Sequence, residues 1–210
     1  MIAAVVGGKG GVGKSTVALN VAAELGGVVV DADLGMADLP ESRGPDLHDV
    51  LAGRACAVEA VDESGAVDIL PCGRALAGAR AADPRRLVGA LAAVEREYGD
   101  VLVDCAAGLS ADVGLPLFAA DRCLVVTRPT RVAGADALRA RALARELDCG
   151  LAAVAVNRAN GVGNAEWAFG APAVAIPESE RVREATSHGL PVRELDGEES
   201  EPFARLAARL

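Results

Sequence analysis

A glycine-rich segment directly after a short apolar run places the narrowest limits on how this chain can fold. The run Ile2–Val6 is wholly apolar, and residues 8–15 read Gly-Lys-Gly-Gly-Val-Gly-Lys-Ser. These eight residues match G-x-x-x-x-G-K-[ST] at every fixed position. Residues 14–25 follow with apolar side chains at helical spacing. The pattern therefore predicts a strand, a loop and a helix, with backbone N–H groups and the helix N-terminus facing a phosphate group.

Each residue type in this loop has a predicted task. Lys14 is expected to reach the β- and γ-phosphates of a nucleotide, and the Ser15 hydroxyl is expected to bind Mg²⁺. Thr16 can hydrogen-bond the α-phosphate, while the glycines allow the backbone to curl. The predicted nucleotide-binding residues of the loop are Gly8, Gly10, Gly11, Val12, Gly13, Lys14, Ser15 and Thr16.

Lysine occurs nowhere else in the chain. Of the 21 Lys and Arg residues, only Lys9 and Lys14 are lysines, and both lie in this loop. A simple phosphate-binding loop requires the second lysine but not the first. Lys9 therefore calls for a separate explanation.

Short apolar runs alternate with longer Ala-, Leu- and Arg-rich segments along the remaining chain. The predicted strands are 2–6, 28–31, 67–70, 101–104, 124–127, 153–156 and 173–176, and the predicted helices are 14–25, 84–97, 132–146, 179–187 and 202–210. Continuously apolar strands that alternate with helices indicate a mostly parallel sheet with helices on both faces. The sequence thus predicts the α/β fold of a P-loop NTPase, as one domain over 1–210. Its ligand site is expected at the carboxyl ends of the strands, in the loops after 6, 31, 104 and 156.

Several segments resemble the MinD/ParA family of P-loop ATPases. Residues 9–16 (Lys-Gly-Gly-Val-Gly-Lys-Ser-Thr) resemble its deviant Walker A motif, in which Lys9 is the additional lysine. Residues 31–39 resemble the first switch, 101–108 resemble Walker B leading into the second switch, and 47–53 resemble a helix of MinD-like members. Further similarity at 156–158, 176–178 and 189–192 extends the resemblance over nearly the whole chain.

The resemblance implies an Mg²⁺-dependent ATPase in which two subunits enclose two ATP molecules. Lys9 would reach the phosphates bound by the partner, and Lys14 those of its own subunit. Asp33 would position the attacking water and lie near the metal, so the implied catalytic residues are Lys9, Lys14 and Asp33. The implied metal site contains Ser15, Asp33 and Asp104, with Asp31 nearby. The alternatives are that Asp33 is only a turn residue and that Asp104 is purely structural.

The resemblance also implies a place for the adenine base. Asn157 matches a position that hydrogen-bonds adenine in relatives, and an amide offers the donor and acceptor that this requires. The alternative is an asparagine that caps the end of a strand. Arg158 and Pro177 are expected to line the same pocket.

Some features differ from the family pattern. Asp38 and Ala106 stand where many relatives have Asn and Pro. The tail from 198 to 210 has an apolar stripe but only two arginines, so a packed terminal helix is favoured over a membrane anchor. Three arginines between 139 and 145 (Arg139, Arg141 and Arg145) favour a solvated, ion-paired face over a DNA-binding one. The net charge of -9 also disfavours DNA or a membrane surface as a partner.

The five cysteines are scattered and form no C-x-x-C pair, so buried, reduced thiols in a cytoplasmic protein are expected. Trp167 and Phe169 are expected to pack in the interior. The favoured function is a homodimeric ATPase whose nucleotide state a regulatory protein reads in spatial positioning. The alternatives are an ATP-driven carrier of an Fe–S or other metal cluster, which usually needs paired cysteines, and an ATP-binding scaffold without catalysis.

Overall fold

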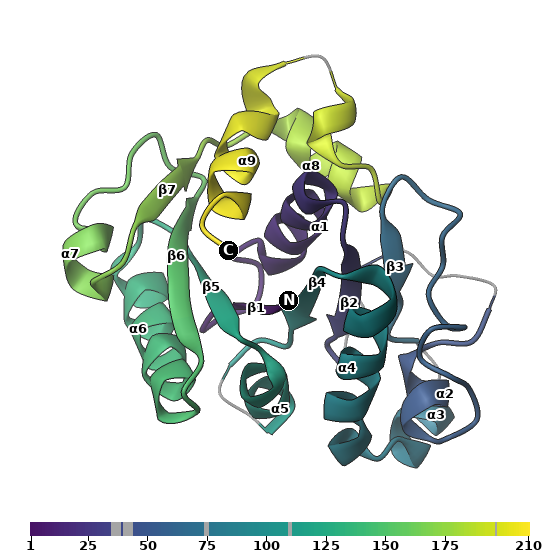
Figure 1. The fold of residues 1–210 in the computed structure, drawn as a ribbon. Helices are drawn as coiled ribbons and strands as arrows, with labels where there is room; N and C mark the ends of the chain where they lie inside the picture. Colours follow the sequence, from purple (N-terminus) through teal and green to yellow (C-terminus); the bar gives the residue numbers. More distant parts are fainter. Residues whose placement is uncertain (35–38, 40–43, 74–75, 109–110, 196) are drawn as a thin grey trace.

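The chain folds around a seven-stranded sheet in the computed structural model, which describes residues 1–34, 39, 44–73, 76–108, 111–195 and 197–210 (Figure 1). The strands are β1 (Ile2–Val6), β2 (Val28–Ala32), β3 (Asp68–Leu70), β4 (Val101–Cys105), β5 (Arg122–Thr127), β6 (Gly150–Asn157) and β7 (Ala173–Ile176). Their order in space is β3-β2-β4-β1-β5-β6-β7, and every neighbouring pair is parallel. The predicted α/β fold is confirmed, and the parallel arrangement brings the carboxyl ends of the strands to one edge.

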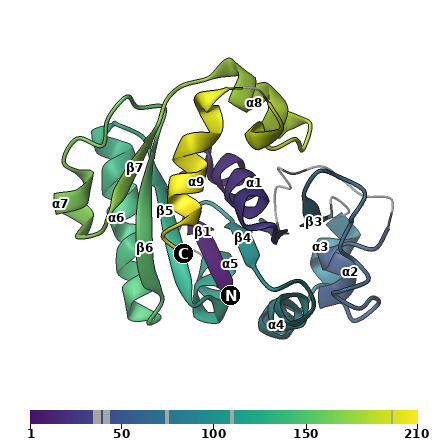
Figure 2. The same ribbon diagram turned by 45° about the horizontal axis from the view of Figure 1, so that its top comes forward.

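Helices cover both faces of this sheet. One face carries α1 (Lys14–Leu25), α8 (Glu180–Ser187) and α9 (Glu201–Ala207), and the other carries α4 (Leu87–Tyr98), α5 (Ala111–Ala119) and α6 (Arg131–Glu146). Figure 2 shows the two helical layers with the sheet between them. Because successive strand side chains point to opposite faces, Val5 packs with the first layer whereas Ala4 and Val6 pack with the second.

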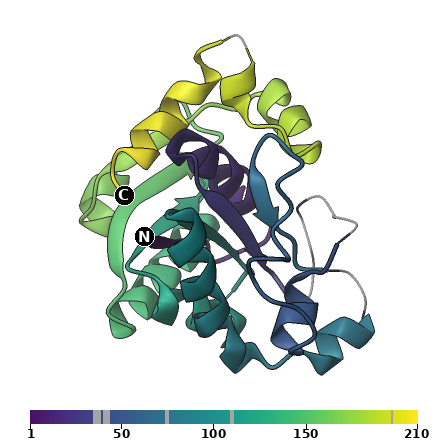
Figure 3. The ribbon, with the colours of Figure 1, turned by 45° about the vertical axis from the view of Figure 1, so that its right-hand side comes forward.

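The small helices α2 (Leu47–Leu51) and α3 (Leu76–Ala81) lie side by side at the β3 end of the sheet (Figure 3). Asp46 caps α2, since its carboxylate accepts a hydrogen bond from the Asp49 N–H at 3.0 Å. Helix α7 (Ala165–Phe169) lies at the opposite end, between β6 and β7.

The chain's last helix, α9, packs on the domain through its apolar stripe. Phe203 and Leu206 are fully buried, and the helix lies against α1. The apolar stripe predicted from the sequence therefore packs into the core, as expected of a packed terminal helix. Among the described residues, no helix is long and apolar enough to cross a membrane.

The sequence patterns missed three helices. Helix α5 contains Gly114 and Pro116, residues that normally interrupt a helix, and α3 and α7 have only six and five residues. The remaining predicted boundaries differ from those observed by a few residues; for example, residues 84–86 form a 3₁₀ turn before α4.

Two expectations about burial were wrong. Trp167 is 86% exposed, because the short helix α7 turns only Ala165 and Phe169 toward the core. Cys56 is exposed, whereas the other four cysteines are buried. On α6, Arg139 forms an ion pair with Asp136 at 2.8 Å, which is the arrangement expected of a solvated face.

Candidate nucleotide-binding site

The glycine-rich loop joins β1 to α1 at the carboxyl edge of the sheet. Gly13 has φ +104° and ends the loop, and α1 begins at Lys14. A Cβ atom at Gly10 or Gly11 would meet no other atom within 4 Å, so the backbone there borders open space. A Cβ at Gly8 would instead lie 2.2 Å from the backbone of Asp136 on α6. The loop thus packs on α6 at Gly8 and borders open space at Gly10 and Gly11, which leaves room for a phosphate group.

The two lysines of the loop lie in different surroundings. Lys14 is only 7% exposed, and its Cδ atom would lie 3.4 Å from a Cβ built on Gly7, so the side chain folds back over the loop. Lys9 is exposed, and no carboxylate among the described residues forms an ion pair with it. Lys14 therefore lies against its own loop, whereas Lys9 is exposed at the surface.

Buried carboxylates lie near the carboxyl ends of β2 and β4, two neighbouring strands on one side of β1. Asp31 on β2 and Asp104 on β4 are register partners, and they are 0% and 2% exposed. Both point to the α1 face, since they share the parity of Val29 and Leu102. Asp33 follows β2, and its backbone N–H donates to Asp31 Oδ1 at 3.1 Å. Acidic groups from two strands thus meet beside the N-terminus of α1.

This donor set fits a magnesium ion. Mg²⁺ prefers oxygen ligands and usually binds through one or two carboxylates together with phosphate oxygens and water. Ser15, in the first turn of α1, and the carboxylates of Asp33 and Asp104 are the predicted residues that could supply such oxygens. Neighbouring carboxylates in a buried position also favour a cation, because like charges repel strongly there. Among the described residues, no group of three or more His, Cys, Asp or Glu side chains is placed to hold a metal ion by itself.

Cys105 lies next to Asp104 on β4. Burial of the thiol raises its pKa well above the usual value, and the charge of Asp104 raises it further. A thiol that stays protonated is a poor nucleophile, so Cys105 is a packing residue of this site.

Asn157 ties the end of β6 to the phosphate loop. Its Nδ2 donates to the Val12 carbonyl at 2.8 Å, and its Oδ1 accepts from the Arg158 N–H at 2.9 Å. A Cβ at Gly13 would lie 2.0 Å from this Nδ2, so the contact requires glycine there. The side chain therefore braces the loop and the strand end, and its predicted contact with adenine would use the second N–H of the amide.

A cavity of about 250 Å³ opens beside this brace. Its lining includes Gly13 and Thr16 of the loop together with Asn157, Arg158 and Pro177. The structure therefore brings the loop and all three residues of the predicted base pocket to one cavity. Binding of adenine there stays a prediction.

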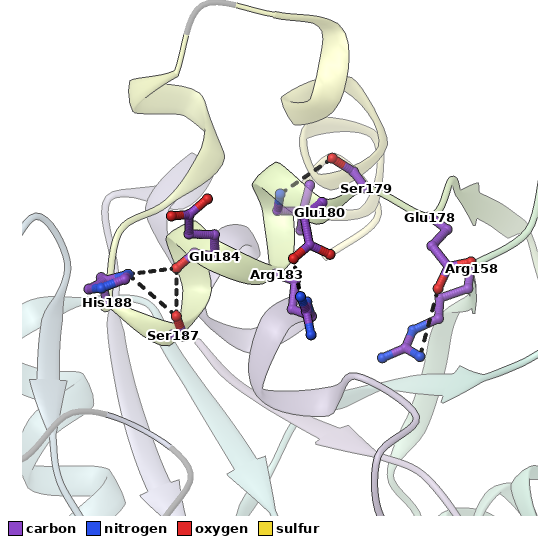
Figure 4. Close-up of polar contacts among 9 residues, drawn as sticks. Arg158, Glu178, Ser179, Glu180, Arg183, Glu184, Ser187 and His188 are labelled. Atoms are coloured by element: carbon purple, nitrogen blue, oxygen red, sulfur yellow. Dashed lines mark hydrogen bonds and ion pairs between the residues drawn. The ribbon is translucent and has the colours of Figure 1, made fainter.

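The far wall of the cavity comes from the start of α8 (Figure 4). Ser179 caps this helix by accepting from the Val182 N–H at 3.3 Å, Glu180 pairs with Arg183, and Arg158 lies 3.9 Å from Glu178. No sequence motif assigned Ser179, Val182 or Arg183 to a site. The available signal was a cap residue two positions after Pro177, which starts a helix at the same edge of the sheet.

Part of the predicted switch segments lies outside the described residues. Of residues 31–39, the structure describes only 31–34 and 39, and Asp38 lies outside the described residues. Ala106, the other departure from the family pattern, is buried directly after β4. Gly108, the last residue of the segment that resembles Walker B and the start of the second switch, adopts φ +96°, a conformation that glycine takes without strain.

Comparisons with known proteins agree with this geometry. An uncharacterized ATP-binding protein of Methanocaldococcus jannaschii is 31% identical over 99% of this chain and 86% of its own length. The cell division ATPase MinD of Pyrococcus furiosus superimposes with a TM-score of 0.89 at 29% identity, over 99% of this chain and 97% of that one. MinD of Pyrococcus horikoshii, solved with Mg-ADP, gives 0.89 at 29% identity, over 98% and 93%.

The family assignment rests on the sequence as a whole. Residues 3–192 match the sequence profile described as the CobQ/CobB/MinD/ParA nucleotide binding domain. That range contains the phosphate loop, the buried carboxylates and the cavity beside Asn157. The chain is therefore a member of the CobQ/CobB/MinD/ParA family and an ATP-binding protein of its MinD/ParA branch.

Proposed function

We propose that this chain is an Mg²⁺-dependent ATPase that forms a homodimer when ATP is bound and acts as a switch in spatial positioning. The observation that carries the proposal is the contrast between the two lysines of one loop. Lys14 is buried against its own loop, whereas Lys9 is exposed on the open side. A second subunit that faces the loop would meet Lys9 first.

The residues of one subunit account for binding. The loop N–H groups and Lys14 would hold the phosphates, and Ser15, Asp33 and Asp104 would hold Mg²⁺. The ion would neutralise charge on the phosphates when it is bound. Thr16, Asn157, Arg158 and Pro177 border the cavity proposed for the base.

Hydrolysis would require two further groups. Asp33 is proposed to orient the attacking water, since it lies beside Asp31 at the edge of the sheet. Lys9 from the partner would stabilise negative charge on the phosphoryl group during transfer. The similar protein from Pyrococcus furiosus is a cell division ATPase, and the one from Pyrococcus horikoshii was solved with Mg-ADP. Both support hydrolysis here.

A switch acts through the protein that reads it. The closed dimer and the open state would present different surfaces, and a regulatory protein would bind only one of them. We propose neither DNA nor a membrane as the direct partner. The net charge is -9, Arg139 is ion-paired on α6, and the apolar stripe of α9 lies in the core.

The lysines test the proposal directly. In Lys14→Ala we expect ATP binding to fall by about 100-fold, since a main phosphate contact is removed. In Lys9→Ala we expect binding within about threefold of the original but a turnover about 100-fold lower, because Lys9 acts only across the dimer. Arg85→Ala is the matched control, because Arg85 is an exposed cation outside the loop, on the 3₁₀ turn before α4.

ATP affinity would be measured by calorimetry, phosphate release by a coupled assay, and the oligomeric state by light scattering with and without ATP. Turnover that is unchanged in Lys9→Ala, or a monomer at saturating ATP, would refute the dimeric mechanism. A single-turnover experiment with excess protein separates the scaffold alternative, which predicts no phosphate release.

A further inference from the structure

Two buried side chains behind the Asp33 segment have no part in the mechanism proposed above. His48 lies on α2 and is 2% exposed, and Cys72 follows β3 and is fully buried. The Cys72 Sγ and the His48 Nε2 lie 3.5 Å apart. Both atoms also contact the backbone of the two residues that follow β2.

The contacts fall on consecutive carbonyl groups. The Cys72 thiol donates to the Asp33 carbonyl at 3.2 Å, and His48 Nε2 lies 3.3 Å from the Leu34 carbonyl. A carbonyl oxygen can only accept, so the ring hydrogen of His48 is on Nε2 in this arrangement. Each side chain thus supplies one donor to one backbone acceptor.

The N–H groups of the same two residues are bonded as well. The Asp33 N–H donates to Asp31 Oδ1 at 3.1 Å, and the Leu34 N–H donates to the Ala32 carbonyl at 3.0 Å. All four backbone polar groups of Asp33 and Leu34 therefore have a partner. Because these four hydrogen bonds fix the backbone, they also fix the direction in which the Asp33 side chain projects.

The donors themselves are held firmly. The N–H groups of Leu47 and His48 donate to the carbonyls of Pro71 and Cys72, at 2.8 and 3.2 Å, which joins the start of α2 to the chain after β3. Gly78 of α3 packs on the ring, since a Cβ there would lie 3.0 Å from His48 Cβ. The pair is thus part of a packed unit at the β3 end of the sheet (Figure 3).

We propose that His48 and Cys72 are positioning residues that fix the backbone of Asp33 and Leu34 and thereby orient the Asp33 carboxylate for hydrolysis. The inference rests on the proposed function, because it assigns Asp33 to the attacking water. Positioning of this kind is worth much in catalysis, since small displacements of a reacting group cost a large factor in rate.

The test compares side chains of similar size with and without a donor. His48→Gln keeps an N–H at the place of Nε2, whereas His48→Met fills the space without one. Cys72→Ser keeps a donor, whereas Cys72→Ala does not. His188→Met is the matched control, because it changes the chain's other histidine, which is exposed near the end of α8.

In His48→Met and Cys72→Ala we expect turnover to fall by about tenfold, with the dissociation constant for ATP within about twofold of the original. Gln at position 48 and Ser at position 72 should recover most of the rate, and the control should keep it. If the two side chains had a purely structural role, the variants would lower the melting temperature. Turnover would then not fall selectively while ATP affinity stayed the same. Original turnover in a folded Cys72→Ala, His48→Met double variant would refute the proposal.

Hydrogen exchange of the nucleotide-free protein gives a second readout that needs no activity. The peptide containing Asp33 and Leu34 should exchange about tenfold faster in His48→Met than in His48→Gln, because one hydrogen bond to its carbonyls is lost. Equal exchange in the two variants would refute the positioning role even if the original protein hydrolyses ATP. If that protein hydrolyses no ATP, the proposed function fails, and the exchange result alone decides whether the pair holds this backbone.

Discussion

The contact between Gly13 and Asn157 supports a prediction with a calculable cost. Gly13 has φ +104°, and a Cβ there would lie 2.0 Å from Asn157 Nδ2. Alanine at this position therefore faces two penalties. One is the left-handed backbone, at about 1–2 kcal/mol. The other is displacement of the Asn157 side chain from two hydrogen bonds, at about 1 kcal/mol each. We expect Gly13→Ala to lower the free energy of unfolding by about 3–4 kcal/mol.

Gly11 offers a matched control in the same loop. It also has a positive φ, +74°, but a Cβ there would meet nothing within 4 Å. Gly11→Ala should therefore cost only the backbone part, about 1–2 kcal/mol. The difference between the two variants isolates the contact with Asn157.

A double-mutant cycle completes the experiment. Asn157→Ala alone should cost about 2 kcal/mol, since it removes both hydrogen bonds. In that background the clash is gone, so Gly13→Ala should cost no more than Gly11→Ala does. Urea unfolding monitored by circular dichroism supplies the four free energies. Additive effects of Gly13→Ala and Asn157→Ala would refute the reasoning, because the two residues would then not be coupled.

The remaining predictions concern other parts of the molecule. Asp104→Asn should raise the Mg²⁺ concentration for half-maximal turnover by about 10-fold, because a carboxylate near the proposed ion is neutralised; a magnesium titration measures it, and an unchanged midpoint contradicts the assignment. Phe203→Ala should lower the free energy of unfolding by about 3–5 kcal/mol, as for other large buried side chains, and a loss under about 1 kcal/mol would contradict the packing of α9. In the folded protein a thiol reagent should modify Cys56 quickly, and it should modify the four buried cysteines only after unfolding. The absorbance of the released chromophore counts the modified thiols, and fast modification of more than one thiol in the folded protein would contradict the burial. The hydrogen bond to Glu63 raises the pKa of Tyr98 from 10.0 to about 12, so stability associated with this pair should be present below pH 10 and lost as the pH rises toward 12. Tyr98 is the chain's only tyrosine, so its ultraviolet titration in the folded protein and in urea measures the shift, and equal midpoints would contradict it.

Much of the fold could be predicted because its signals lie within short stretches of sequence. Each apolar run of the predicted strands became a parallel strand, and the loop that ends at Gly13 lies between β1 and α1 as its spacing requires. Helix α5 escaped prediction because Gly114 and Pro116 normally end helices, and only packing in the finished domain overrides this tendency. The exposure of Trp167 could not be predicted either, since it depends on which face of a five-residue helix meets the core.

The candidate site divides in a similar way. Lys9, Lys14 and Ser15 follow from one local motif, and Asp104 from its place at the end of an apolar strand. The cap residue Ser179 signals only that a helix starts at this edge of the sheet. That Ser179, Val182 and Arg183 share a cavity with the loop depends on the order of strands in the sheet.

By itself the sequence determined a phosphate-binding loop, a parallel sheet and the residue types available for chemistry, because glycine spacing and apolar periodicity act on the local backbone. Only the tertiary structure decided which distant groups meet. It brought Asn157 to Val12, 145 residues away, paired Asp31 with Asp104, and set His48 and Cys72 behind Asp33 and Leu34. The physical reason is that strand order and register place these groups, and neither is encoded in any single segment of the chain.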